Sequence, residues 1–336
     1  MKTYLLQRNQ GIRGLEIVER PSPRPGPRQV RIAMRAVALN ARDLYIANAS
    51  PGGPSIVPCS DGAGEIVEVG AEVTRWHVGD RVFPNFYPAW VDGPPTPETT
   101  APGLGGGTQP GLLAEEVVID ADALVAMPEH MSYVEAATLP CAGVTAWNAL
   151  FGVSRLLPGD AVLLLGTGGV SIWALQLAKA AGLRAIVTSS DDDKIAQALA
   201  LGAGAGINYR AFPQWSAEVR RHTGGKGVDL VVEVGGRGTL AQSLASTRMG
   251  GTVAMVGGVS GDFGAELPPD GLTEGAHVIA GVRVGSRRNA ESLAAFTSAA
   301  PLRPFVDRVF DFRSAGEAYA HLAAGKHVGK VVVQVE

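Results

Sequence analysis

The stretch from Gly159 to Lys194 reads GDAVLLLGTGGVSIWALQLAKAAGLRAIVTSSDDDK, and it decides the fold. It holds an apolar strand at 161–165, a glycine-rich turn, an amphipathic helix and a second apolar strand. After the turn, apolar residues recur at i, i+3, i+4 and i+7, the spacing of a helix with one buried face. They are Val170, Trp173, Ala174 and Leu177. This order predicts a βαβ unit that binds a dinucleotide.

The turn Gly166-Thr167-Gly168-Gly169-Val170-Ser171 carries the chemistry of this unit. Its glycines allow a sharp bend and let a pyrophosphate approach backbone N–H groups at a helix start. Glycine is common here, at 44 of 336 residues, so the prediction rests on the strand before the turn and the helix after it. The alternative is a tight turn that binds nothing. We predict cofactor contacts at Gly166, Thr167, Gly168, Gly169 and Val170.

The end of the second strand predicts which nicotinamide cofactor is used. In NAD-binding sites a carboxylate here accepts the ribose hydroxyls and repels a 2′-phosphate. This strand, Ala185 to Thr188, is followed by Ser189 and Ser190, whose hydroxyls can donate to a phosphate, and Lys194 can add positive charge. The pattern favours NADP(H). The acids at 191–193 leave two interpretations open: a helix cap with an acidic first turn, or a displaced ribose-binding acid.

Composition restricts the class of protein. The chain has 336 residues and a formal net charge of −3, without a basic run suited to nucleic acid. The start, MKTYLLQRNQG, has too short an apolar run for a signal peptide, and no stretch reaches transmembrane length. Two cysteines, Cys59 and Cys141, cannot form a disulfide framework. We expect a cytoplasmic protein that acts on a small molecule, with neither nucleic acid nor membrane as partner.

The pattern of elements changes near residue 140. Short runs separated by Pro and Gly come first and predict antiparallel strands at Lys2–Leu6, Gln29–Leu39, Gly64–Val69 and Glu115–Ile119. Strands and helices then alternate, which predicts a parallel sheet: strand Val228–Val234, helix Thr239–Arg248 and strand Thr252–Val256. The last part predicts helices at Glu291–Ser298 and Ser314–Ala324 and a strand at Val331–Val335. Residues 84–111, rich in Pro, Gly and Thr, predict a long loop.

These features predict an α/β protein of two domains. We assign residues 1–140 to the first part of a catalytic domain and residues 141–282 to a dinucleotide-binding domain. Residues 283–336 are expected to return to the first domain.

Three blocks resemble the medium-chain dehydrogenase/reductase superfamily: SDGAGEIVEVGAEVTRWHVGDRV at 60–82, LPCAGVTAWNAL at 139–150, and the glycine turn. The resemblance extends over nearly the whole chain and is to the zinc-independent quinone oxidoreductase and alcohol dehydrogenase-like branch. It implies a GroES-like, mostly antiparallel β catalytic domain and a doubly wound Rossmann domain. It also implies a homodimer in which the strand from His277 to Val284 pairs with its twin.

The chain departs from the zinc-binding members of this superfamily. They have Cys where this chain has Asn40, and a His-Glu pair where it has Ser60-Asp61; only Cys141 matches a zinc ligand. Zn²⁺ requires three protein ligands of Cys, His or carboxylate type around an open position. The loop also lacks the four cysteines of the structural zinc site. We therefore predict a metal-free protein, in which Cys141 is a small buried apolar residue.

The block Asn40-Ala41-Arg42-Asp43-Leu44-Tyr45 resembles the zinc-independent branch, in which an Asn and sometimes a Tyr lie beside the nicotinamide. Without a metal, hydrogen bonds must stabilise the charge that develops on a carbonyl oxygen. We predict Asn40, Tyr45 and Ser60 as catalytic candidates. The alternatives are that Asn40 caps a helix, that Arg42 and Asp43 form a structural ion pair, and that Tyr45 lies in the core. Solvent is a possible proton source.

Further cofactor contacts are predicted from matching positions and strand ends. Thr145 is expected near the nicotinamide and Tyr209 beside the adenosine phosphate. The remaining candidates are Val234, Gly235, Val256, Gly257, Gly258, Arg283 and Lys330. Ligands collect at the carboxyl ends of parallel strands, although a glycine there can also serve a turn alone.

Together these features predict an NADPH-dependent, zinc-independent oxidoreductase acting on a quinone, enone or carbonyl. Two alternatives remain within enzymes: a metal-free alcohol dehydrogenase or ketoreductase, and a biosynthetic reductase with a larger substrate. A third alternative is an NADP-binding sensor or structural protein with little turnover.

Overall fold

A computed structural model describes residues 1–7, 10–48, 55–258 and 271–335. These residues form two compact units, the first of residues 1–144 and 285–336 and the second of residues 145–284. The sequence-based boundaries lie after residues 140 and 282. No helix in the described part of the chain is long and apolar enough to span a membrane.

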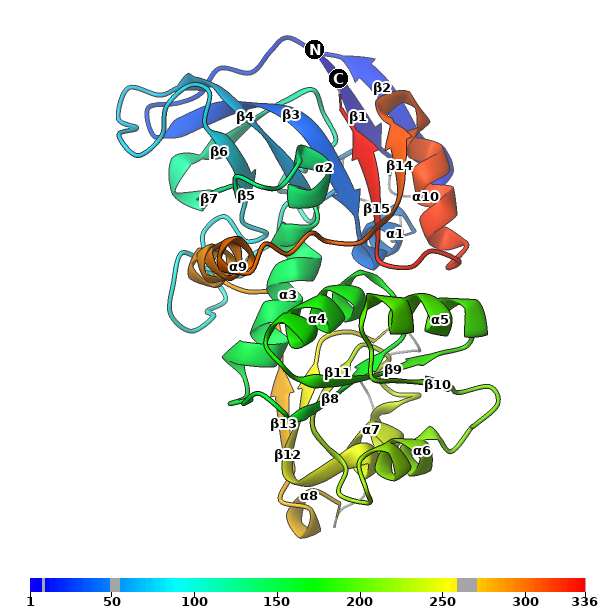
Figure 1. The fold of residues 1–336 in the computed structure, drawn as a ribbon. Helices are drawn as coiled ribbons and strands as arrows, with labels where there is room; N and C mark the ends of the chain where they lie inside the picture. Colours follow the sequence, from blue (N-terminus) through cyan, green and yellow to red (C-terminus); the bar gives the residue numbers. More distant parts are fainter. Residues whose placement is uncertain (8–9, 49–54, 259–270, 336) are drawn as a thin grey trace. The chain divides into compact units, whose positions relative to one another are not determined.

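The second unit is built on a six-stranded parallel sheet (Figure 1). Its strand order is β10-β9-β8-β11-β12-β13, so the first strand in the chain lies at the centre and the order reverses beside it. The strands are β8 (Ala161–Leu165), β9 (Arg184–Ser189), β10 (Ala205–Asn208), β11 (Val228–Glu233), β12 (Thr247–Met255) and β13 (Val278–Gly281). Every neighbouring pair is parallel, and all carboxyl ends therefore lie along one edge.

Helices cover both faces of this sheet (Figure 1), which makes it doubly wound as predicted. On one face lie α4 (Gly169–Ala180) and α5 (Asp192–Leu201), and on the other lie α6 (Trp215–His222) and α7 (Leu240–Ser246). Strand β8 is buried along its whole length, because it is covered on both sides. The unit also contains η4 (Asn148–Gly152) and α8 (Gly271–Glu274), and α3 (Val144–Trp147) crosses the unit boundary.

The predicted helix at Thr239–Arg248 is too long at its carboxyl end. α7 ends at Ser246, and β12 begins at Thr247. Thr247 already pairs with Val228 of β11, so strand pairing takes the chain out of the helix. The predicted strand at 252–256 covers the later part of β12, which ends at Met255.

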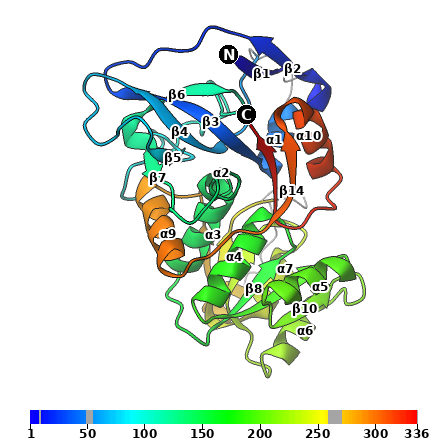
Figure 2. The same cartoon turned by 45° about the horizontal axis from the view of Figure 1, so that its top comes forward.

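The first unit contains a mixed but mostly antiparallel sheet, in agreement with the predicted GroES-like domain (Figure 2). Its order is β14-β15-β3-β4-β5-β7, with β6 paired to β3, and only β14 and β15 are parallel neighbours. The strands are β3 (Gln29–Leu39), β4 (Asp61–Val69), β5 (Arg81–Pro84), β6 (Glu116–Asp120), β7 (Leu124–Ala126), β14 (Val306–Asp311) and β15 (Lys330–Gln334). A separate hairpin pairs β1 (Lys2–Leu6) with β2 (Leu15–Glu19).

The helices of this unit are short, apart from two near its carboxyl end. They are η1 (Gly11–Gly14), α1 (Ala41–Ala47), η2 (Ala121–Ala123), α2 (Tyr133–Ala136), η3 (Leu139–Gly143), α9 (Arg287–Ala299), η5 (Phe312–Ser314) and α10 (Ala315–Ala323). α10 packs along β14 and β15 (Figure 2), and its buried Tyr319 joins the apolar core of the sheet. Residues 85–115 contain neither a helix nor a strand, as predicted for the long loop.

Candidate functional site

Three strand ends in the first unit bring polar side chains from distant parts of the chain together. β3 runs antiparallel to β4 and β15, so its last residues lie opposite the first residues of both strands. Asn40 follows β3, Asp61 begins β4 and Lys330 begins β15. Antiparallel pairing thus places these three side chains in one cluster.

The Lys330 ammonium lies at the centre of this cluster. The residue is 2% exposed. Its Nζ donates to the carbonyl oxygen of Leu39 at 2.6 Å and to Oδ1 of Asn40 at 2.5 Å, and Asp61 Oδ2 lies 3.7 Å away. An ammonium only donates hydrogen bonds, so the amide oxygen of Asn40 must face it. Asn40 Nδ2 is buried, and within the described ranges no group accepts a hydrogen bond from it.

Asp61 is fully buried, and both of its oxygens have partners. Ser60 Oγ donates to Oδ1 at 2.7 Å, and the backbone N–H of Cys141 donates to Oδ2 at 3.1 Å. Ser60 is itself 0% exposed, so Asp61 holds its hydroxyl proton. Cys141 is partly exposed as a residue. Burial raises the pKa of its thiol to about 12, and the Asp61 carboxylate adds to this rise. The thiol is therefore protonated at neutral pH.

The backbone of Asn40 is held by a second carboxylate. Asp43 Oδ2 accepts the Asn40 backbone N–H at 2.8 Å, and Asn40 is the N-cap residue of α1. Arg42 Nη1 lies 3.5 Å from Asp43 Oδ1, which confirms the predicted ion pair. Arg42 also donates to Leu104 O at 2.9 Å and lies over the Phe86 ring. Burial raises the pKa of Asp43 to about 6, against the opposing effect of Arg42.

Tyr45 lies on α1, and 60% of its surface is exposed. This exposure rules out the alternative that Tyr45 is a core residue. A catalytic role for its hydroxyl stays a prediction.

The donor groups of this cluster do not meet the requirements of zinc. Zn²⁺ binds thiolate, imidazole and carboxylate ligands. The cluster instead offers the Asn40 amide, the Ser60 hydroxyl and the single thiol of Cys141. The Asp61 carboxylate lies near the Lys330 ammonium, whose charge repels a cation. The part of the chain that the structure describes contains no group of three His, Cys, Asp or Glu side chains able to hold a metal ion.

In the second unit, the glycine turn follows β8 at the carboxyl edge of the sheet. Gly166 has a φ of +71°, a conformation that favours glycine, and Gly168 is the N-cap of α4. A Cβ on either glycine would meet no atom of residues 1–7, 10–48, 55–258 and 271–335 within 4 Å. No side chain in the described part of the chain caps this helix, so its first N–H groups can donate to a ligand. Ser171 Oγ donates to Leu165 O at 2.6 Å and closes the turn. The open space in front of this turn fits the pyrophosphate of a dinucleotide.

Two of the three acids at 191–193, which follow β9, have hydrogen-bond partners within the unit. Asp191 is the N-cap of α5 and accepts the backbone N–H groups of Asp193 and Lys194, which confirms the capping interpretation for this residue. Asp192 accepts a hydrogen bond from Asn208 Nδ2 at 2.8 Å. Ser189 is 4% exposed. Ser190 and Lys194 are both half-buried. Two of the three carboxylates are thus engaged within the unit.

Other predicted contacts lie at the same edge of the sheet. Tyr209 follows β10, is 42% exposed, and donates its backbone N–H to Ser189 O at 3.0 Å. The loop after β12 holds Val256, Gly257 and Gly258, and Val256 donates its N–H to Glu233 O at 2.8 Å. Arg283, an exposed residue, comes two positions after the end of β13. Thr145 lies on α3 and is 3% exposed.

The loop after β11, which contains Val234 and Gly235, is fixed by a buried carboxylate. Glu233 is 0% exposed. Its Oε1 accepts the N–H groups of Gly235 and Gly236 at 2.6 and 2.9 Å and the Thr239 hydroxyl at 2.6 Å. Its Oε2 accepts the Ser243 hydroxyl. A Cβ at Gly235 would lie 2.3 Å from Thr239 Oγ1, so packing alone requires glycine there.

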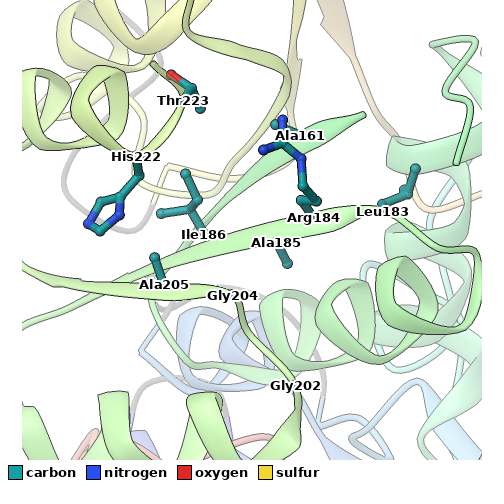
Figure 3. Close-up of a pocket in the computed structure, with 10 residues that line it drawn as sticks. All are labelled: Ala161, Leu183, Arg184, Ala185, Ile186, Gly202, Gly204, Ala205, His222 and Thr223. Carbon is teal, nitrogen blue, oxygen red and sulfur yellow. The ribbon is translucent and has the colours of Figure 1, made fainter. Parts of the chain in front are cut away.

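A pocket of about 280 Å³ lies elsewhere in the second unit (Figure 3). It is lined by the first residues of three strands, Ala161, Arg184 and Ala205, and by His222 at the end of α6. These are the amino ends of the strands. The pocket is therefore at the edge opposite to the glycine turn, and it contains none of the predicted site residues.

Sequence reasoning missed Asp61, Asp43 and Glu233 as residues that organise the sites. A signal existed for Asp61, because it is the acidic residue in the block where zinc-binding members carry Glu. Lys330 is predicted as a cofactor contact, and its ammonium contacts Leu39, Asn40 and Asp61. No local pattern connects Lys330 with Asn40, which is 290 residues away.

Comparisons with known proteins agree with the fold. Residues 169–299 match the zinc-binding dehydrogenase family, and residues 26–129 match the alcohol dehydrogenase GroES-like domain. A zinc-type alcohol dehydrogenase-like protein of Schizosaccharomyces pombe is 41% identical over 319 residues, with 92% of each chain covered. A quinone oxidoreductase of Pseudomonas aeruginosa is 31% identical and also covers 92% of each chain.

Among solved structures, an NAD-dependent alcohol dehydrogenase superposes with a TM-score of 0.90 at 33% identity, covering 100% of both chains. The fold, the glycine turn and these similarities define an oxidoreductase that uses a nicotinamide cofactor. The chain belongs to the medium-chain dehydrogenase/reductase superfamily.

Proposed function

We propose that this protein is an NADPH-dependent, zinc-independent reductase of a quinone, enone or other carbonyl compound. The observation that carries the proposal is the Lys330 ammonium bound to Asn40 Oδ1 beside Asp61. Zinc-binding members of the superfamily place a ligand where this chain has Asn40. Here the Lys330 ammonium lies next to that position, and the Asn40 amide nitrogen has no acceptor among the residues that the structure describes.

A reduced nicotinamide, when bound, supplies a hydride, which for an enone forms a C–H bond at the β-carbon. The C=C electron pair then moves toward the carbonyl, whose oxygen becomes negatively charged. Asn40 Nδ2 can donate a hydrogen bond to this oxygen, while Lys330 holds the other end of the same amide. A proton from water at the α-carbon completes a two-electron reduction. Ser60 and Cys141 are poor proton donors for this step. The Ser60 hydroxyl proton is held by Asp61, and the Cys141 thiol has a pKa of about 12.

The preference for NADPH rests on the end of β9. Ser189 and Ser190 carry no charge that would repel a 2′-phosphate, and Lys194 lies in the first turn of α5. The capping role of Asp191 and the contact of Asp192 with Asn208 disfavour a ribose-binding carboxylate from these two residues. The solved neighbour named as NAD-dependent points the other way. Calorimetric titrations with NADPH and NADH decide between them: tighter NADH binding would overturn this preference.

The test of the reaction is consumption of NADPH, followed by absorbance, with 1,4-benzoquinone, trans-2-hexenal and hexanal as acceptors. Zinc is measured by elemental analysis of dialysed protein, and about one zinc per chain would overturn the metal-free site. Tight NADPH binding without consumption by any acceptor would instead favour a sensor or structural protein.

A metal-free alcohol dehydrogenase or ketoreductase is the second candidate, because two of the similar proteins are named as alcohol dehydrogenase or alcohol dehydrogenase-like. Product analysis with trans-2-hexenal separates the two reactions. Hexanal as product means that the C=C bond was reduced, and trans-2-hexenol means that the C=O bond was reduced.

We further propose a homodimer formed through β13. This strand is the last in the sheet order, and Val278 on it is 49% exposed. An exposed edge strand with apolar side chains is suited to pairing with a second copy. Analytical ultracentrifugation at micromolar concentration tests this, and a monomer alone would remove the dimer.

A further inference from the structure

Asn40 is fixed from two directions. Asp43 accepts its backbone N–H at 2.8 Å, and Lys330 donates to its side-chain oxygen at 2.5 Å. The Lys330 ammonium is in turn held by Leu39 O at 2.6 Å and lies 3.7 Å from Asp61. A buried charge needs such partners to remain in the folded protein. The lysine is thus a rigid part of the cluster and not a loose surface cation.

The contact with Lys330 determines which end of the Asn40 amide is free. A side-chain amide can be turned by 180° about its last bond, which exchanges its oxygen and nitrogen. With the nitrogen toward Lys330, two donors would face each other. The ammonium therefore keeps the oxygen on its own side and leaves Nδ2 as the free donor. Within the described ranges this buried nitrogen has no acceptor, and an unpaired buried donor calls for a partner.

We propose that Lys330 is a positioning residue for the reaction: it holds the Asn40 amide so that Nδ2 donates to the carbonyl oxygen of the substrate. The Lys330 ammonium, which donates to the amide oxygen, also polarises the amide and makes Nδ2 a better donor. This inference rests on the proposed function and replaces the predicted contact between Lys330 and the cofactor. It also narrows the substrate to compounds whose reduction places negative charge on an oxygen.

The experiment is a double-mutant cycle with Asn40→Ala and Lys330→Met, measured with NADPH and the acceptor that the wild-type enzyme turns over fastest. We expect Asn40→Ala to lower kcat by about 100-fold, as for loss of one oxyanion donor. Lys330→Met should lower kcat by about 10-fold while the Kd for NADPH stays within 2-fold. In the Asn40→Ala background, Lys330→Met should change kcat less than 2-fold, because its effect passes through Asn40.

Two further variants separate positioning from a general effect on the fold. Asn40→Asp keeps an acceptor for Lys330 but has no N–H donor, so kcat should fall as in Asn40→Ala while the melting temperature is retained. Lys330→Arg keeps a cationic donor and should recover part of the kcat lost in Lys330→Met. Lys326, an exposed lysine four residues earlier, provides the matched control, and Lys326→Met should leave every parameter unchanged.

Three outcomes would overturn the role of Lys330. The first is a 10-fold rise in the Kd for NADPH in Lys330→Met with kcat retained. The second is a kcat in the double variant that is lowered by the product of the two single-variant effects. The third is a wild-type kcat in Asn40→Asp. The last outcome can be read even if Lys330→Met does not fold. If the wild-type enzyme consumes no NADPH with any acceptor, the proposed function fails first, and this role fails with it.

Discussion

The space in front of Gly168 yields a prediction that separates cofactor binding from folding. Gly168 has a φ of −76° and a ψ of −176°, which any residue can adopt, and a Cβ there would meet nothing within 4 Å. Among the described residues, nothing around this position therefore requires glycine. If a pyrophosphate approaches the backbone here, the methyl group of Gly168→Ala occupies part of its space.

The expected change in stability is small because two effects offset each other. Alanine is a poorer N-cap than glycine, which costs roughly 1 kcal/mol. Replacing glycine also lowers the conformational entropy of the unfolded chain, which stabilises the folded state by about 0.4–1 kcal/mol. The free energy of unfolding should thus change by less than about 1 kcal/mol. The Kd for NADPH should rise at least 10-fold, since losing even one close contact of about 1.4 kcal/mol gives this factor.

The assay combines calorimetric titration with NADPH and a thermal melt of the same variant. Gly316→Ala on α10 is the matched control, since a Cβ at Gly316 also meets nothing within 4 Å. That change should raise stability by up to about 1 kcal/mol, as alanine favours a helix, and leave the Kd unchanged. An unchanged Kd in Gly168→Ala would refute the placement of the pyrophosphate. A loss of several kcal/mol in stability would show that the glycine serves the fold instead.

Three more predictions concern buried or charged groups. Burial raises the pKa of Asp43 to about 6, so its charged form destabilises the fold above that pH. The free energy of unfolding of the wild type, relative to Asp43→Asn, should therefore rise by up to about 3 kcal/mol as the pH falls from 7 to 4. Urea unfolding across this range tests this, and the absence of such a rise would mean that Asp43 is not buried. Glu233→Ala should lower the free energy of unfolding by at least about 3 kcal/mol, since two N–H groups and two hydroxyls lose their acceptor. Glu233→Gln keeps Oε1 and should lower it by about 1 kcal/mol. Equal losses for the two variants in chemical denaturation would contradict this. Ser190→Asp, chosen over the more buried Ser189, should weaken NADPH binding at least 10-fold relative to NADH, and an unchanged ratio in competition titrations would place the 2′-phosphate elsewhere.

Three of the predicted strands match the structure to the residue, whereas β4 begins at Asp61, three residues before its predicted start. Lys2–Leu6, Gln29–Leu39 and Ala161–Leu165 have the predicted bounds, because each is a strand-forming run bounded by turn residues. Helix α9 begins at Arg287, four residues before its predicted start, because Ser286 caps it by accepting the Asn289 N–H. That capping pair was visible in the sequence. The end of α7 was not, since pairing with β11 decides where β12 begins.

The sequence by itself determined the dinucleotide-binding unit, since strand, glycine turn and helix are adjacent and their chemistry is local. The family resemblance implied that Asn40 and Ser60 stand where zinc-binding members have ligands. Only the tertiary structure decided what surrounds Asn40. Lys330 lies 290 residues away and reaches the amide because β15 and β4 both pair with β3. Side chains that meet through the pairing of distant strands have no characteristic separation along the chain, so a single sequence does not reveal the contact.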